Sequence, residues 1–317
     1  MRIAVFSDIH ANSEALQAVY IDSQAQGVDT CWFLGDAVGY GPDAVPAIKF
    51  IKYMIDPDCW VAGNHDAMFA DLLTEDELRV TAGVALDVIQ LHHRQIAGDD
   101  EAKDFCEANF TDERRVPREQ HINGRLHTIT HAGQFERHIF RYIYPWQKRF
   151  FLTDEFKWLQ SRQEETGLLQ VEWLGHTHVP MLVRAASGEN GFDIEAERIE
   201  PCKPFKLDER LTIINPGSVG QPRDGDVRAA YLIFDSDHDE VTFRRVLYPW
   251  QEPFRKLNEL MQIPGEEDET GAKLAESTVD NLKRRLATAE PTNSTPPDWL
   301  SHFEYAAAVD CNGDADV

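Results

Sequence analysis

Two histidines, His176 and His178, are separated by one residue and follow directly after an apolar run, residues 168–174. The run is typical of a buried strand and Val179-Pro180 comes next, so both imidazoles leave the end of one strand. A neutral imidazole offers one lone pair to a metal ion, and the pair could bind one ion or two adjacent ions. A polar turn without a metal explains these residues alone equally well.

The N-terminal part of the chain also places metal-binding residue types after a strand. Residues 2–7 predict a buried strand, and Asp8 and His10 follow it. Side chains two positions apart in an extended chain project to the same side. Asn12 or Ser13 then caps a predicted helix. A strand followed by a helix is the opening of a β-α-β unit.

Two further predicted strands end in polar side chains. The strand at 31–34 ends at Asp36, and a short strand at 59–62 ends in Gly-Asn-His-Asp at 63–66. Open α/β sheets bind ligands beyond the carboxyl ends of their strands, so we expect these side chains to lie together.

A further histidine follows the strand predicted at 125–130. That strand ends at His131 and also contains His127, but the strand-end residue is favoured because the loops at that edge form the site. The remaining histidines of this region have no motif around them and are expected to be partly exposed and non-catalytic: His92, His93 and His121.

The alternation of strands and helices is interrupted by residues 71–124, which predict a helical insertion opened by a capping box at Thr74 and Glu77. From residue 181 onward, strands follow one another without helices, which indicates a largely antiparallel half of the fold.

Composition changes again near the C-terminus. An acidic run, a helix at 271–289 and a linker-like stretch at 291–297 follow one another there. We therefore predict one domain over residues 1–250 and a C-terminal helical and acidic extension over 251–317, through which the protein could form a homo-oligomer.

The 317-residue chain carries 31 Lys and Arg against 55 Asp and Glu, a net charge of -24. Such a surface repels the phosphates of nucleic acids and acidic membranes, so a nucleic-acid partner is disfavoured. No apolar run approaches the roughly 20 residues of a transmembrane helix and no signal peptide is recognised, so we expect a cytoplasmic protein without a membrane partner. The five scattered cysteines are typical of reduced thiols.

The strand ends form five short blocks. In chain order they are Asp-x-His at 8–10, Gly-Asp at 35–36, Gly-Asn-His-Asp at 63–66, a single His at 131 and Gly-His-x-His at 175–178. Over about residues 1–235 the sequence resembles the calcineurin-like metallophosphoesterase superfamily, which has these blocks in this order. The resemblance implies an α/β (α+β) fold in which two mixed β-sheets pack as a sandwich flanked by helices.

The resemblance also implies two divalent metal ions bridged by Asp36. The implied ligands are Asp8, His10 and His178 for one ion, and Asn64, His131 and His176 for the other. His65 would be the acid near the leaving group, held in orientation by Asp66. The single-His block departs from the common His-Gly form, because Ala132 follows.

The chemistry of two such ions fits these residue types. Two ions about 3.5–4 Å apart need a bridging carboxylate, and they activate a bridging hydroxide for in-line attack on phosphorus. Nitrogen and oxygen ligands without sulfur suit Mn, Fe, Zn, Co or Ni. Two divalent ions carry four positive charges, and Asp8, Asp36 and a hydroxide carry three negative charges. The centre therefore keeps a charge of about +1, which attracts an anionic phosphate despite the acidic surface.

Two residues outside the blocks could contact a substrate, namely Tyr40 in Gly-Tyr-Gly-Pro and Arg223 in Pro-Arg-Asp. For Arg223, an ion pair with Asp224 or Asp226 is an equally good interpretation.

The predicted activity is hydrolysis of a small phosphomonoester, phosphodiester or nucleotide by the bridging hydroxide. Alternatives are a dinucleoside polyphosphate hydrolase and a protein phosphatase, although the protein phosphatase branch typically carries Asp-Arg-Gly and Gly-Asn-His-Glu, which this chain lacks. A non-catalytic, protein-binding scaffold of the same fold is disfavoured because no ligand position is degraded.

Overall fold

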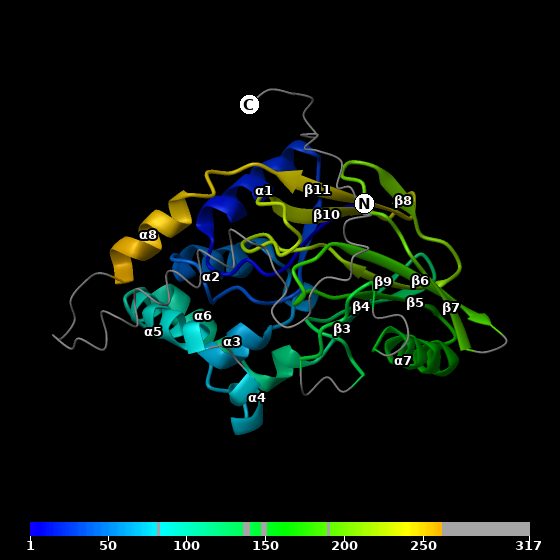
Figure 1. Ribbon diagram of the computed structural model, residues 1–317, viewed down its shortest axis with the longest axis horizontal. Helices are drawn as coiled ribbons and strands as arrows, with labels where there is room; N and C mark the ends of the chain where they lie inside the picture. Colours follow the sequence, from blue (N-terminus) through cyan, green and yellow to red (C-terminus); the bar gives the residue numbers. More distant parts are fainter. Residues whose placement is uncertain (81–82, 136–139, 147–150, 189–190, 262–317) are drawn as a thin grey trace.

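The computed structural model describes residues 1–80, 83–135, 140–146, 151–188 and 191–261 (Figure 1). Two β-sheets form its centre. Sheet A has the strand order β2-β1-β10-β11-β8, and sheet B has the order β3-β4-β5-β9-β6-β7. Both sheets contain parallel and antiparallel pairs, because β1 is parallel to β2 and antiparallel to β10, while β9 is parallel to β5 and antiparallel to β6.

The strands of sheet A are β1 (Arg2–Phe6), β2 (Thr30–Phe33), β8 (Pro204–Lys206), β10 (Ala229–Asp235) and β11 (Glu240–Val246). Those of sheet B are β3 (Arg118–Ile122), β4 (Arg125–Ile129), β5 (Leu169–Trp173), β6 (Met181–Gly188), β7 (Gly191–Ala196) and β9 (Leu211–Asn215). The helices are α1 (Ser13–Ala25), α2 (Ala44–Met54), α3 (Asn64–Phe69), α4 (Glu75–Val80), α5 (Gly83–Ala97), α6 (Asp100–Asn109), α7 (Phe151–Thr166) and α8 (Glu252–Met261), with single 3₁₀ turns at Pro57–Cys59 and Asp112–Arg115.

Three hydrophobic layers hold these elements together. Between the sheets, large buried side chains such as Trp32 and Leu232 of sheet A face Trp173 and Ile214 of sheet B. A second layer joins sheet A to α1, α2, α5 and α6, and a third joins sheet B to α7. In Figure 1, α1 and α7 accordingly lie on opposite sides of the two sheets. The predicted sandwich of two mixed sheets flanked by helices is confirmed.

Several predicted element boundaries follow from local hydrogen bonds. Asn12 caps α1, its side chain accepting from the backbone N–H of Ala15 at 3.1 Å. The capping box also forms, since Thr74 N–H donates to Glu77 at 2.7 Å and Glu77 N–H donates to the Thr74 hydroxyl at 3.3 Å.

Three other predictions need correction. Residues 59–62 form no full strand, because Asp56 and Pro57 start a 3₁₀ turn and only a single bridge joins Trp60 to Phe33. The stretch 71–124 is not helical throughout, since β3 pairs with β4 within it. Of the cysteines, three are free thiols, but Cys202 is disulfide-bonded.

Helix α8 packs against the body of the domain. Leu257 is buried, and the Lys256 ammonium group lies 2.5 Å from the carboxylate of Glu14 and 2.7 Å from that of Asp43. The acidic run, the helix at 271–289 and the linker predicted beyond residue 264 lie outside the described residues. The division at residue 250 stays a prediction.

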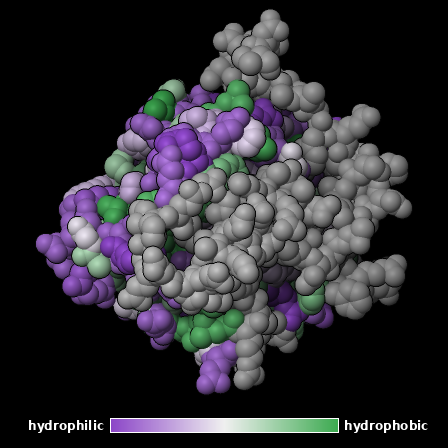
Figure 2. Space-filling model, turned by 60° about the vertical axis from the view of Figure 1, so that its left-hand side comes forward, coloured by the Kyte–Doolittle hydropathy of each residue, from purple (hydrophilic) through white to green (hydrophobic). Residues whose placement is uncertain are grey.

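The face shown in Figure 2 is mainly hydrophilic over the described residues, with small separate hydrophobic areas. None of the helices in the described ranges is both long enough and apolar enough to cross a membrane.

Candidate metal centre

The fold brings all seven predicted metal ligands to one place. Loops after β1, β2, β4 and β5 carry six of them, and Asn64 is the first residue of α3. Their side chains form overlapping groups whose candidate ligand atoms lie within 4.8 Å of one another: Asp8 with His10 and His178, and Asp36 with His131 and His176. A third such group contains His10, Asp36 and His65.

Hydrogen bonds fix the orientation of His10 and His178. The Nδ1 atom of His10 lies 2.9 Å from the Val38 carbonyl oxygen, and that of His178 lies 2.5 Å from the Gln221 carbonyl oxygen. A carbonyl only accepts, so each Nδ1 carries the proton and each Nε2 a lone pair. The two Nε2 atoms nevertheless face each other at 3.1 Å. Facing lone pairs repel, and a cation bound by both removes the repulsion.

The second half of the centre has the same character. His131 donates from Nδ1 to the Leu34 carbonyl at 2.8 Å, and its Nε2 atom lies 3.1 Å from Asn64 Oδ1 and 3.3 Å from Asp36 Oδ2. Burial lowers the pKa of this ring, but Asp36 outweighs burial and raises the pKa to about 9. The Nε2 atom of His176 is buried without a hydrogen-bond partner. A buried polar atom without a partner is costly, so this donor set fits a second cation.

The two aspartates are almost completely buried, at 0% and 1% exposure. Burial raises the pKa of Asp8, but the nearby His178 outweighs it, so that the pKa falls below its usual value. For Asp36, His131 and His65 outweigh burial and hold the pKa well below the usual range. Both side chains are therefore carboxylates, and Asp36 Oδ2 lies 3.7 Å from His10 Nε2 as well as beside His131.

Backbone strain is concentrated at this centre. Left-handed φ angles between 48° and 66° occur at five of the seven predicted ligands: Asp8, His10, Asp36, His176 and His178. Such angles are uncommon outside glycine, and they turn side chains inward from the strand ends. The preceding glycines make room: a Cβ atom on Gly63 would lie 2.0 Å from Asp36 Oδ1, and one on Gly175 would lie 2.9 Å from Asp8 Oδ2.

His65 and Asp66 are both buried in α3, but they are arranged differently from the expectation. The Asp66 carboxylate accepts hydrogen bonds of 2.8–3.2 Å from the backbone N–H groups of residues 36–38 and Gly63. The His65 Nδ1 atom has no hydrogen-bond partner. Asp66 therefore anchors the loop that carries Asp36 rather than bonding to the His65 ring.

Tyr40 and Arg223 lie at the edge of the centre. The Tyr40 ring is 4.8 Å from the ring of His10 and 4.6 Å from that of His65, and the Arg223 guanidinium lies 5.8 Å from the Tyr40 ring centroid. The alternative ion pairs of Arg223 do not form, because Asp224 pairs with Arg245 and Asp226 with Arg228. Arg223 bonds to the Gln221 side chain instead, at 2.8 Å.

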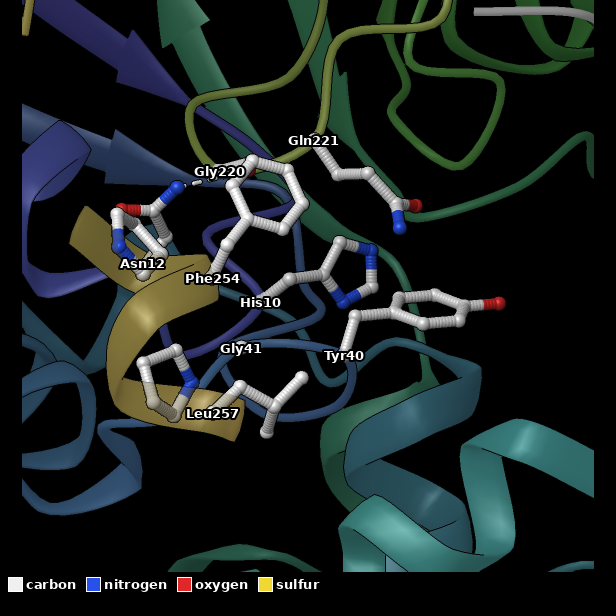
Figure 3. Close-up of a pocket in the computed structure, with 10 residues that line it drawn as sticks. His10, Asn12, Tyr40, Gly41, Gly220, Gln221, Phe254 and Leu257 are labelled. Carbon is white, nitrogen blue, oxygen red and sulfur yellow. Dashed lines mark hydrogen bonds between the residues drawn. The ribbon is translucent and has the colours of Figure 1, made fainter. Parts of the chain in front are cut away.

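Helix α8 closes one side of His10. Figure 3 shows His10, Tyr40 and Gln221 around a small pocket whose other wall is formed by Phe254 and Leu257 of α8. The cavity measures about 20 Å³, which is room for about one water molecule. A substrate must therefore approach the centre from another side.

The sequence interpretation missed two neighbours of the centre. His92 was expected to be partly exposed but is fully buried, bonded to the loop around Tyr40. Tyr142 stacks on the ring of His176 at 4.1 Å. No local motif marks either residue. His127, in contrast, lies between the sheets as an acceptor for Trp173 Nε1 at 3.1 Å, away from the ligands.

Comparisons with known proteins identify the family. The family model of the calcineurin-like phosphoesterase superfamily domain matches residues 1–239. An uncharacterized protein of Methanocaldococcus jannaschii is 30% identical over 267 residues, which cover 83% of this chain and 96% of that protein. A symmetrical bis(5'-nucleosyl)-tetraphosphatase of Psychromonas ingrahamii is 34% identical over 67 residues, covering 21% of this chain and 24% of that protein.

Solved structures agree with this assignment. A metallophosphoesterase from Sphaerobacter thermophilus has 28% sequence identity and a TM-score of 0.60, covering 89% of this chain and 98% of that chain. A hypothetical protein of Pyrococcus horikoshii shares the fold, with 16% identity, a TM-score of 0.57, and coverage of 86% and 97%. The chain belongs to the calcineurin-like phosphoesterase superfamily. It is a metal-dependent hydrolase of phosphate esters.

Proposed function

We propose that the protein hydrolyses a small phosphomonoester, phosphodiester or nucleotide with two divalent ions bound side by side. One ion would be held by Asp8, His10 and His178, and the other by Asn64, His131 and His176, with Asp36 between them. The observation that carries the proposal is the set of converging lone pairs: His10 and His178 face each other at 3.1 Å, and His176 Nε2 has no partner.

When bound, two such ions lower the pKa of a water molecule and neutralise phosphoryl oxygens during in-line displacement. The carboxylates of Asp8 and Asp36 supply the fixed negative charge that holds the ions. Carbonyl acceptors on Nδ1 of His10, His131 and His178 fix the orientation of each ring, so that Nε2 is the atom that would bind an ion.

His65 is the proposed acid for the leaving group. Its Nδ1 faces Gly39, where an added Cβ atom would lie 2.4 Å away, so Nε2 is left to face a substrate. Burial lowers the pKa of His65 to about 4, against the opposing effect of Asp36. An anionic phosphate beside the ring favours the protonated form, which can then donate to the departing oxygen.

Arg223 and Tyr40 are proposed to contact the substrate. Among the described residues, no carboxylate lies within ion-pair distance of the half-buried Arg223 guanidinium. Such a group binds phosphoryl oxygens through two parallel N–H donors. The Tyr40 ring, between Arg223 and His65, would line the same opening.

A dinucleoside polyphosphate is the second candidate substrate. It is supported by the 67-residue similarity to the symmetrical tetraphosphatase. That similarity covers 24% of the relative, so the simpler esters remain the first proposal.

Metal reconstitution tests the proposal. Protein stripped by a chelator is reloaded separately with Mn, Fe, Zn, Co or Ni, and elemental analysis is combined with assays on p-nitrophenyl phosphate, bis(p-nitrophenyl) phosphate and diadenosine tetraphosphate. We expect two ions per chain and hydrolysis of at least one ester. His238→Asn, at an exposed histidine, is the control for nonspecific metal uptake. Absence of bound metal together with inactivity on all three substrates would favour a binding scaffold.

A further inference from the structure

His92 of α5 is a fully buried histidine whose two ring nitrogens both bond to one loop. The Gly39 N–H donates to Nδ1 at 3.2 Å, and Nε2 lies 2.8 Å from the Gly41 carbonyl oxygen. An amide N–H can only donate and a carbonyl can only accept, so Nδ1 is unprotonated and Nε2 carries the proton. One imidazole thus spans the backbone on both sides of Tyr40.

The loop that His92 holds lies directly against the proposed acid. A Cβ atom added to Gly39 would lie 2.4 Å from Nδ1 and 2.8 Å from Cγ of His65. Tyr40 has a left-handed φ of 59°, which is costly for a bulky side chain and persists only when the surroundings enforce it. Two hydrogen bonds with His92, one on each side of Tyr40, contribute to that constraint, together with the bonds from the Gly41 N–H to the His10 and Gly39 carbonyl oxygens.

No hydrogen bond fixes the His65 ring through Nδ1, because this atom is buried without a partner. Asp66, the expected partner, is occupied by backbone N–H groups. What limits ring movement is packing: the Gly39 backbone lies on one side, and the Tyr40 ring lies at 4.6 Å. The position of His65 therefore depends on the position of the loop.

We propose that His92 is a positioning residue for His65: it clamps the Gly39–Tyr40–Gly41 loop, and the loop holds the His65 ring in line with the leaving group. This inference rests on the acid role proposed for His65. It assigns a function in the reaction to a residue of the helical stretch that follows α3, outside the strand ends that carry most of the ligands.

Helix α5 offers a matched control one turn further along. Gln95 also holds the same loop, accepting from Ala44 N–H at 3.1 Å and donating to the Pro42 carbonyl at 2.5 Å. Its contacts lie beyond Gly41 and away from His65. If these bonds have a purely structural role, substitutions of His92 and of Gln95 should have similar effects. If His92 positions His65, only substitution of His92 should change the acid step.

The variants are His92→Gln, His92→Asn and Gln95→Ala. An Asn amide oxygen takes the place of Nδ1 and keeps the bond from Gly39, whereas a Gln amide nitrogen takes the place of Nε2 and keeps only the bond to Gly41. Since Gly39 is the residue against His65, we expect a larger effect from His92→Gln than from His92→Asn. Either variant retains one hydrogen bond, which favours folding.

The first readout is kcat on aryl phosphate esters whose leaving groups range from p-nitrophenol to phenol. A misplaced acid slows poor leaving groups most. We expect His92→Gln to lower kcat about tenfold or more for phenol and much less for p-nitrophenol, with KM and metal content nearly unchanged. Gln95→Ala should keep the leaving-group dependence of the parent protein. Equal losses across the series, or the same change in Gln95→Ala, would overturn the proposal.

The second readout does not depend on turnover. The imidazole C–H signal of His65, assigned by its loss in His65→Ala, should shift in His92→Gln and not in Gln95→Ala. If His65→Ala leaves the leaving-group dependence unchanged, His65 is not the acid. In that case only the shift of the His65 signal tests whether His92 positions the His65 ring. An unshifted His65 signal in His92→Gln would overturn the positioning role in either case.

Discussion

Strand β5 connects two groups of buried acidic side chains with opposite properties. Beyond its end, the backbone N–H of His176 lies within 3.2 Å of both oxygens of Asp8, which belongs with Asp36 to the candidate metal centre. Within the strand, Glu172 lies beside Glu155 of α7. Each of these four acidic residues is at most 1% exposed.

The neighbours of each group decide its charge. Burial raises the pKa of every carboxyl, but imidazoles reverse the effect at Asp8 and Asp36 and keep both ionised. At Glu172 burial is reinforced by Glu155, and the pKa lies well above its usual value. Glu155 accepts a hydrogen bond from the backbone N–H of Gln134 at 2.6 Å, which favours the charged form of Glu155. Glu172 therefore holds the proton. One group is suited to a cation and the other to a proton.

Replacing Asp36 with alanine should break the metal centre and have the largest effect. The change removes the carboxylate between the two halves, so at least one ion is lost and turnover falls by at least about 100-fold. Elemental analysis and ester hydrolysis measure both losses. Asp193→Ala, at an exposed position of β7, should keep both. Full metal stoichiometry in Asp36→Ala would contradict the ligand assignment.

His65→Ala should separate chemistry from metal binding. Its ring lies near His10 and Asp36, so geometry alone would also allow it to be a ligand. As an acid, its loss should leave the metal content unchanged while kcat falls by about 10²–10⁴-fold. Metal loss in this variant would show that His65 is a ligand rather than an acid.

Glu155→Ala should affect stability and leave the metals in place. Glu155 accepts from the N–H groups of Gln134 and Phe135, at 2.6 and 3.2 Å, and its loss leaves two partly buried donors without a partner. We expect unfolding to become easier by about 2–4 kcal/mol in denaturant titrations. Glu164→Ala, on the exposed side of α7, is the control. An unchanged unfolding midpoint would mean that Glu155 does not hold this segment.

Glu172→Gln should have the smallest effect, seen in the pH dependence of stability. The usual pKa of 4.5 applies to the unfolded chain, and the folded value is higher. The stability that Glu172 contributes is therefore fully present below about pH 4.5 and is lost as the pH rises toward the folded pKa. A glutamine places no second negative charge beside Glu155 at any pH, so the variant should be more stable than the parent protein at pH 8 and lose less stability between pH 5 and 8.

Melting temperatures across that pH range test this expectation, with Glu164→Gln as the matched control. Parallel curves for Glu172→Gln and the parent protein would show that Glu172 does not carry the proton.

These two acidic groups also differ in how well the sequence predicted them. The residues of the candidate metal centre could be picked out because six of the seven follow the strands β1, β2, β4 and β5, and the ends of parallel strands meet at one edge. Glu155 and Glu172 lie in a helix and a strand with no motif around them. Their pairing depends on how α7 packs against sheet B, which periodicity does not specify.

The sequence by itself determined the strands before Asp8, Asp36, His131 and His176, the residue types at their ends and, through five blocks in a fixed order, the family. Those features are local, since they depend on a few neighbouring residues and on the period of a strand. The tertiary structure alone decided that Asp66 anchors the Asp36 loop, that Arg223 is left without a carboxylate partner among the described residues, and that His92 reaches across to Gly39. The bonds of Asp66 to Val38 and of His92 to Gly39 join residues 28 and 53 positions apart. The isolation of Arg223 from carboxylates depends on the neighbouring aspartates pairing with other arginines. Neither kind of contact can be read from sequence spacing.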